Sequence, residues 1–101
     1  VLTVVNADDE TTTPLTCSLA QNFPNPFNPS TTINFSTKEY GNVVVKVFDL
    51  LGREIAILVD KELPAGLHTI DFSDENLSSG IYYYTLNAGS FHTSKKMMLL
   101  K

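Results

Sequence analysis

Apolar side chains occupy alternate positions along most of this chain, and a period of two is the pattern of strands rather than helices. In the stretch "NVVVKVFD", Val43, Val45 and Val47 fall on one face, while Val44 and Phe48 fall on the other. Two apolar faces indicate a central strand that is covered on both sides or flanked by long side chains of its neighbours. No segment of helical length shows apolar residues at a spacing of roughly 3.6. We therefore predict an all-β chain.

Turn residues divide the alternating stretches into short strands. Gly52 interrupts "LLGREIAIL", Pro64 and Gly66 punctuate "KELPAG", and "AGS" precedes the final stretch. "SDENLSSG" is predicted as a polar loop, with one helical turn capped by Ser73 or Asp74 as the alternative. Strands at intervals of about 8–12 residues, with turns between them, are typical of a sandwich. The predicted fold is an immunoglobulin-like antiparallel β-sandwich of about seven strands.

Length and composition allow one domain with a short polar extension. The chain has 101 residues, of which 43% are hydrophobic and 18% are charged, as in an ordinary globular chain. Residues 1–14 end in the polar run "NADDETTTP", and we interpret them as the end of a preceding domain followed by a linker. The domain itself is predicted to span residues 15–101 and to open with a strand in which Leu15, Cys17 and Leu19 alternate with polar residues.

The charge and hydropathy of the chain argue against two classes of partner. A formal net charge of −4, with seven Lys and Arg residues, leaves no basic face large enough to neutralise many phosphates. No apolar run approaches the length of a membrane helix. We therefore expect no nucleic-acid partner and no membrane span.

The titratable residues do not form a catalytic or metal-binding pattern. His68 and His92 fall on separate predicted strands, and alternation gives them no shared pocket with Asp49 or Asp71. Two histidines without further ligands at a suitable spacing do not make a zinc site. Cys17 is alone, and we interpret it as a small, half-buried apolar residue. "SDENLSS" could hold calcium, but a solvated capping loop is the favoured interpretation. The chain is predicted to be no enzyme and to carry no cofactor or metal.

The segment "QNFPNPFNPSTT" is stiff and poor in backbone donors. Pro24, Pro26 and Pro29 have no N–H group and hold the residues before them in extended geometry. Such a segment cannot lie inside a sheet, so we predict a strap along an edge or over an open end of the sandwich. Phe23 and Phe27 are predicted to anchor this strap in the core. The asparagine side chains are expected to supply the missing hydrogen bonds by capping local turns.

Three stretches in this order carry a resemblance to a known family: "LAQNFPNPFNPSTTINFS", "VKVFDLLGREIAILVDKELPAGLHTIDFS" and "LSSGIYYYTLNAGSFHTSKKMMLLK". From Leu19 to Lys101 the chain closely resembles the type A C-terminal sorting domain of the type IX secretion system. The resemblance implies an immunoglobulin-like domain at the C-terminus of a secreted protein of Bacteroidetes or related phyla. It also implies that the domain directs its cargo through the outer-membrane translocon.

The resemblance further implies partners, a location and a set of signal residues. The partners are the translocon, a sortase-like peptidase and an N-terminal cargo domain, and the cut is expected in the polar stretch before Leu15. The cargo would pass through the periplasm and the outer membrane, and would be secreted or attached to surface lipopolysaccharide. The motifs of the family fall on these sorting-signal residues of this chain: Pro24, Asn25, Pro26, Gly80, Tyr82, Lys95, Lys96, Met97 and Lys101.

Each motif also has a structural interpretation. Gly80 is expected to end a loop at positive φ, and the Tyr82 ring to pack with its hydroxyl on a partner. "KKMMLLK" is predicted as the last strand. Its lysines protect the ends and edge of the sheet in the structural interpretation, whereas in the functional one the translocon recognises this edge by backbone pairing or by the lysine charge. The alternative function is a non-catalytic structural or carbohydrate-binding immunoglobulin-like module, similar to a flagellar hook-capping domain. An exposed pair among Tyr82, Tyr83 and Tyr84 would suit the stacking of sugars.

Overall fold

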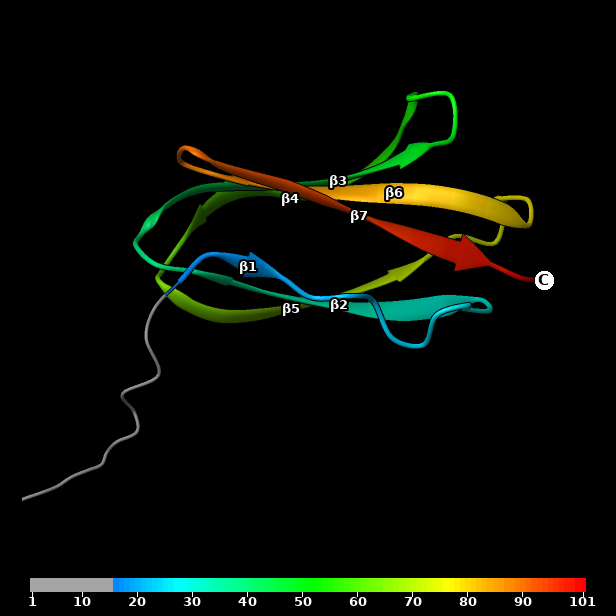
Figure 1. Cartoon of the computed structure of the whole chain (residues 1–101), viewed down its shortest axis with the longest axis horizontal. Coiled ribbons are helices and arrows are strands. Elements are labelled where there is room, and N and C mark those ends of the chain that lie inside the picture. The colour runs from blue at the N-terminus through cyan, green and yellow to red at the C-terminus, as the bar shows by residue number, and fades with distance from the viewer. Residues whose placement is uncertain (1–15) are drawn as a thin grey trace, which may run out of the picture.

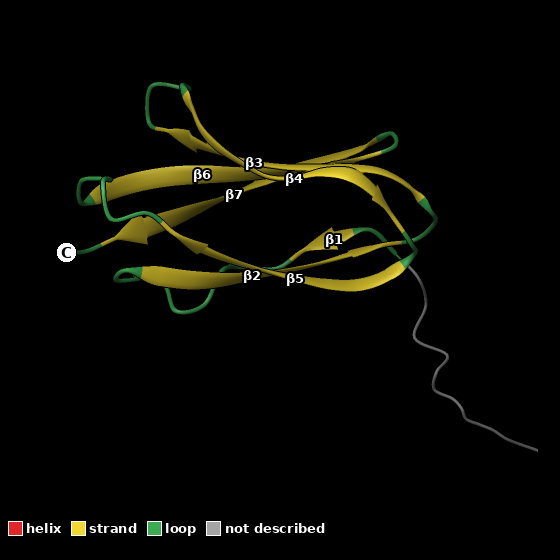
Figure 2. Cartoon of the chain, turned by 180° about the vertical axis from the view of Figure 1, so that it is seen from behind, coloured by secondary structure: helices red, strands yellow, loops and turns green. Residues whose placement is uncertain are grey.

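A computed structural model describes residues 16–101 of the chain as two antiparallel sheets that pack face to face (Figures 1 and 2). One sheet has three strands in the order β1-β2-β5, and the other has four in the order β4-β3-β6-β7. None of the described residues forms a helix long and apolar enough to span a membrane. The predicted all-β sandwich of about seven strands is confirmed. The strands are β1 (Ser18–Leu19), β2 (Ser30–Thr37), β3 (Gly41–Asp49), β4 (Glu54–Leu63), β5 (Gly66–Ser73), β6 (Gly80–Ala88) and β7 (Phe91–Leu99).

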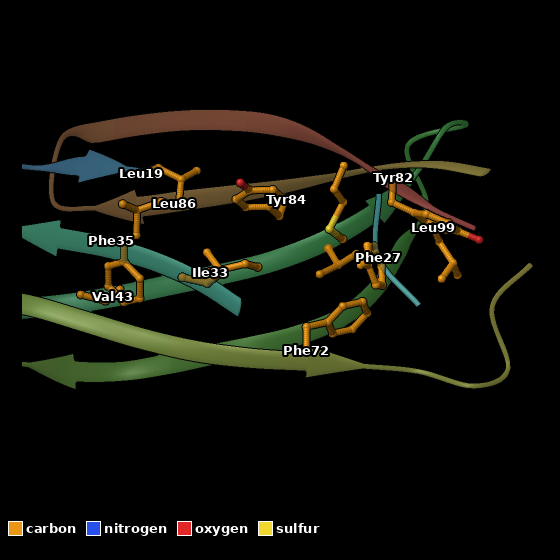
Figure 3. Packing of buried hydrophobic residues seen from close by; sticks show 13 residues of the cluster. Leu19, Phe27, Ile33, Phe35, Val43, Phe72, Tyr82, Tyr84, Leu86 and Leu99 are labelled. Carbon is orange, nitrogen blue, oxygen red and sulfur yellow. The ribbon is translucent and has the colours of Figure 1, made fainter. Parts of the chain in front are cut away.

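The core lies between the inner faces of the two sheets, where the alternation places its apolar side chains (Figure 3). Val43, Val45 and Val47 of β3 are buried there, and β3 lies between β4 and β6 as the predicted central strand. Ile33 and Phe35 of β2 face them from the other sheet. Each fully buried side chain of this size contributes about 1.5–3 kcal/mol relative to an exposed one.

Turns lie at the predicted turn residues, but the turn at Pro64 is shorter than expected. Gly52 lies in the β3–β4 turn with φ at 86°, a conformation that side chains with a Cβ avoid. β4 continues to Leu63 and β5 begins at Gly66, so the turn predicted over "KELPAG" is confined to Pro64 and Ala65. This short connection carries the chain from the four-stranded sheet to the three-stranded sheet.

The loop between β5 and β6 contains no helical turn, so that alternative is wrong. The Asp74 Oδ1 atom accepts a hydrogen bond from the N–H of Asn76 at 2.9 Å. A bond from a side chain to the backbone two residues on closes a tight turn in place of the first turn of a helix. Ser73 is the last residue of β5 rather than a cap. Leu77 packs against the core and draws the loop onto the end of the sandwich.

The first strand is shorter than predicted. β1 comprises Ser18 and Leu19 alone, which pair with Ser36 and Phe35 of β2. Cys17 precedes the strand and is half-buried, as expected. The predicted linker and preceding domain, together with Leu15, lie outside the described residues.

Candidate functional site

We call the segment between β1 and β2, residues 20–29, the strap (Figure 1, light blue). It first pairs with β2 of the three-stranded sheet at Phe23 and then reaches β7, the edge strand of the four-stranded sheet, at Phe27. The N–H of Phe27 donates to the carbonyl oxygen of Met98 at 2.9 Å, and the N–H of Leu100 donates to the carbonyl oxygen of Phe27 at 3.0 Å. These two bonds pair Phe27 with Leu99 in a parallel bridge. The prediction of a strap along an edge is confirmed.

Side chains of the strap extend this pairing along β7. Gln21 Nε2 donates to the carbonyl oxygen of Lys96 at 2.7 Å, and the N–H of Met98 donates to Asn25 Oδ1 at 2.9 Å. Asn25 therefore accepts from a distant strand, and the expectation that it caps a local turn is wrong. Among residues 16–101, no strand lies beyond β7 to accept a hydrogen bond from the Met98 N–H, and the carboxamide of Asn25 accepts it instead. These strap contacts cover β7 from Lys96 onward and do not reach Phe91–Lys95.

A buried polar network holds the strap on the sandwich. The N–H of Asn22 donates to the Tyr84 hydroxyl oxygen at 2.7 Å, and that hydroxyl donates to the carbonyl oxygen of Ala20 at 2.7 Å. Asn22 Nδ2 donates to Thr31 Oγ1 at 2.9 Å, and Thr31 Oγ1 donates to the carbonyl oxygen of Pro24 at 2.9 Å. Burial raises the pKa of the Tyr84 phenol, against a smaller opposing effect of the Asn22 N–H. The phenol therefore stays protonated and able to donate.

The alternation and turn patterns of the sequence did not indicate the members of this network. Tyr84 shares its face with Tyr82 and Leu86, and a buried tyrosine normally needs a partner for its hydroxyl. That requirement was the signal that could have identified Tyr84. Asn22 and Thr31 gave no such signal, because their burial depends on how the strap is placed.

The two phenylalanines of the strap have opposite environments. Phe27 is 1% exposed, and its ring meets that of Phe72 edge to face at a centroid distance of 6.2 Å (Figure 3). Phe23 is 78% exposed, so the prediction that it anchors the strap in the core is wrong. The backbone of Phe23 pairs with Thr32 in extended geometry, and alternation then directs Asn22 inward and Phe23 outward.

Tyr84→Phe is expected to lower the free energy of unfolding by about 1–3 kcal/mol, because the buried N–H of Asn22 loses its acceptor. Denaturation in urea, followed by circular dichroism, measures the change. Tyr83→Phe is the matched control, since Tyr83 lies on the outer face of β6 and is only half-buried. Equal losses in the two variants would contradict the role of the network.

Gly80 and Tyr82 stabilise the end of the sandwich at which the C-terminal strand finishes. The φ of Gly80 is positive, as predicted, at 157°. Tyr82 is buried, and its hydroxyl donates to the carbonyl oxygen of Ser78 at 2.7 Å, which confirms the expected partner. Tyr84 is buried on the same face, and only Tyr83 points outward. The suggested exposed tyrosine pair is therefore absent, and with it the feature that favoured sugar stacking.

The basic residues of the last motif do not form one charged patch. Lys95 lies opposite Tyr84 on the inner face of β7 and is half-buried, whereas Lys96 lies opposite Tyr83 on the exposed outer face. Lys101 follows the strand, and its Nζ donates to the carbonyl oxygen of Glu75 at 2.6 Å. Two adjacent lysines on one strand must point to opposite faces, so their charges are separated by the sheet.

The structure nevertheless brings the three motifs together at one end of the four-stranded sheet. Asn25 meets β7 at Met98, while Tyr82 lies opposite Met97 and Gly80 lies opposite Leu99 across the β6–β7 ladder. Met97 is buried and joins the motif to the core. The predicted signal residues thus form a continuous unit of strap, β6 and β7.

Among residues 16–101, the two histidines and Cys17 are not grouped at one place. Among the described residues, no group of three or more His, Cys, Asp and Glu side chains could hold a metal ion. His68 lies in β5 and His92 in β7, on different sheets. A hollow of about 580 Å³ lies at the opposite end of the sandwich and has Cys17 in its wall. No histidine is among the described residues that line it.

Comparison with known proteins adds two findings. Residues 21–100 match the family described as the secretion system C-terminal sorting domain. Among solved structures, the chain is similar to dimeric latent PorU from Porphyromonas gingivalis, with a TM-score of 0.61 and 23% sequence identity. The likeness covers 79% of this chain but 9% of the PorU chain, and at this identity it shows a shared fold. No curated protein is similar enough to count as a relative.

Proposed function

This chain belongs to the family of C-terminal sorting domains of the type IX secretion system, and we propose that residues 15–101 direct a cargo protein through the outer-membrane translocon. The family match over residues 21–100 carries the proposal. The proposed role is recognition, and this chain supplies no catalytic step. Residues 1–14 would be the end of the cargo and the linker that joins it to the signal.

The contacts among the strap, β6 and β7 favour a sorting signal that the translocon recognises on the folded domain. Asn25 lies against Met98, so its two flanking prolines and the end of β7 belong to one surface. Tyr82 and Met97 are buried and would act by holding that surface in place. Because the strap already covers the backbone of β7 from Lys96 onward, we propose recognition through side chains rather than through strand addition to that part of the edge.

Processing would take place in the polar stretch before Leu15. Its run of Asp, Glu and Thr residues has no apolar periodicity, as is usual for an accessible linker. A sortase-like peptidase would cut there after passage through the periplasm and the outer membrane. The cargo would then be released or attached to the cell surface.

An export assay tests the proposal. Residues 6–101 are fused behind a leader and a fluorescent reporter, and the fusion is expressed in a bacterium with a working type IX system and in its translocon-deficient sibling. We expect reporter at the surface or in the medium of the competent strain alone, with a new C-terminus that maps the cut. Reporter retained in the periplasm of both strains, with a folded and uncleaved domain, would contradict the proposal.

A further inference from the structure

The turn between β3 and β4 carries two exposed leucines that do not contribute to the core. Leu50 is 65% exposed and Leu51 is 78% exposed. The β3–β4 hairpin rises from the four-stranded sheet on the side away from the three-stranded sheet (Figures 1 and 2). Exposure of two adjacent leucines at the tip of a projecting hairpin is unfavourable in water, and neither side chain packs against the core of the sandwich. This observation calls for a function outside the fold.

Hydrogen bonds to Asp49 hold the tip in one conformation. Asp49 Oδ1 accepts from the N–H groups of Leu51 and Arg53, each at 2.9 Å. Asp49 Oδ2 accepts from Arg53 Nε at 2.7 Å, and the N–H of Asp49 donates to the carbonyl oxygen of Arg53 at 2.9 Å. The N–H of Arg53 is the first of the contacts that hold the pKa of the Asp49 carboxyl below its usual range. A tip that is already ordered loses little conformational entropy when it binds.

The charges beside the tip are paired within the hairpin. Arg53 forms an ion pair with Asp49, and Lys46 Nζ lies 3.1 Å from Glu54 Oε1. A partner that receives the leucines therefore needs no charged group to match them. An anionic membrane attracts clusters of unpaired basic residues, and neither the tip nor the net charge of −4 provides one. An uncharged apolar pocket of a protein is the complement that fits.

The tip lies at the same end of the sheet as the C-terminal motif. Asp49 pairs with Tyr82 of β6, and Tyr82 pairs with Met97 of β7. Neighbouring strands lie about 4.8 Å apart, which places Asp49 and Met97 roughly 10 Å from each other. A stable protein partner buries about 800 Å² on each side, so one partner at this end would cover both features.

We propose that Leu50 and Leu51 are the apolar anchor of the sorting domain, and that they enter an uncharged apolar pocket of the protein of the export machinery that reads the end of β7. The inference rests on the proposed sorting function and adds a second contact to it. Anchors of this kind, fully enclosed in a pocket, contribute a large share of the affinity of an interface. The strap and the C-terminal strand would then supply orientation beside the anchor.

The test compares two exposed leucines in the export assay. Leu51→Asn removes part of the anchor, while Leu67→Asn changes a leucine that is 81% exposed at the start of β5, near the opposite end of the sandwich. We expect export of the Leu51→Asn fusion to fall by about tenfold or more, and that of Leu67→Asn to change by less than about twofold. Leu51→Met keeps an apolar side chain and is expected to retain export. Melting curves of the full chain check that all three variants fold.

The outcomes separate this inference from the proposed function. Normal, translocon-dependent export of Leu51→Asn would overturn the anchor and leave the sorting role standing. Absence of export for the unaltered fusion would overturn both. Two solution measurements test whether the hairpin tip binds something else. Sedimentation velocity of the full chain tests for a second copy, and flotation with vesicles of neutral phosphatidylcholine tests for lipid. A dimer, or vesicle binding, that Leu51→Asn abolishes would assign the tip to a second copy or to lipid, and would also overturn the inference.

Discussion

Phe27→Ala is expected to lower the free energy of unfolding by about 3–5 kcal/mol, the cost of removing a buried aromatic ring from a packed core. The ring is almost fully enclosed and contacts Phe72, while the backbone of the same residue carries the parallel pairing with β7. A domain of this size has a total stability of about 5–15 kcal/mol, so the loss removes a large fraction of it. Denaturation in urea measures the change.

Phe23→Ala is the matched control for this prediction. It removes the same ring from the same strap, but from a position that is exposed. Surface substitutions of this kind usually change stability by about 0.5 kcal/mol or less. Comparable losses in the two variants would show that the strap is anchored differently from the arrangement described above. In the export assay, Phe23→Ala also tests whether the exposed ring is read by a partner, since the fold stays intact.

Removal of Met98–Lys101 is expected to abolish export and to destabilise the sandwich. The deletion takes away the buried side chain of Leu99, which alone contributes about 2–5 kcal/mol, and both backbone bonds between Phe27 and the end of β7. The export assay measures the first effect, and a melting curve of the trimmed chain measures the second. Export of a trimmed and unfolded domain would mean that the signal lies elsewhere in the chain.

Two further variants separate the loss of the signal from the loss of the fold. Leu99→Ala leaves the end of β7 in place and opens a cavity in the core. Leu100→Ser changes an exposed side chain and retains the backbone bond to Phe27. A fold-dependent signal predicts that export follows stability, so Leu99→Ala is impaired more than Leu100→Ser. The reverse order would indicate that the outer face of the last residues is itself recognised.

The alternation predicted the strands well because each strand buries one face against a single core. Val45 and Met97 are buried at the positions that a period of two assigns to them. The same pattern is wrong at the hairpin tip: "LLGREIAIL" predicts a strand before the turn at Gly52, but Leu50 and Leu51 belong to the turn between β3 and β4. Asp49 overrides the pattern there, because its side chain satisfies the N–H groups that a strand would offer to a neighbour.

The candidate site was predictable in its parts but not in its assembly. The prolines predicted a stiff segment near an edge, since their chemistry is local. Which edge the segment follows, and which of Phe23 and Phe27 enters the core, depends on hydrogen bonds to Tyr84 and Thr31, which lie outside the strap of residues 20–29. The bond between Asn25 and Met98 joins residues that are 73 positions apart, and no local pattern encodes such a contact.

The pairing of the strap with β7 has a consequence for how the chain is made. Synthesis runs from the N-terminus, so Phe27 leaves the ribosome long before Met98 and Leu100, its hydrogen-bond partners, exist. During that interval the strap is exposed, and contacts between such distant positions are also slow to form. An ordinary strand in this position would offer a free row of N–H groups to other nascent chains. Three prolines among residues 24–29 remove half of these N–H groups. The strap, whose partner in β7 is synthesised much later, is therefore a poor template for the pairing of strands that leads to aggregation.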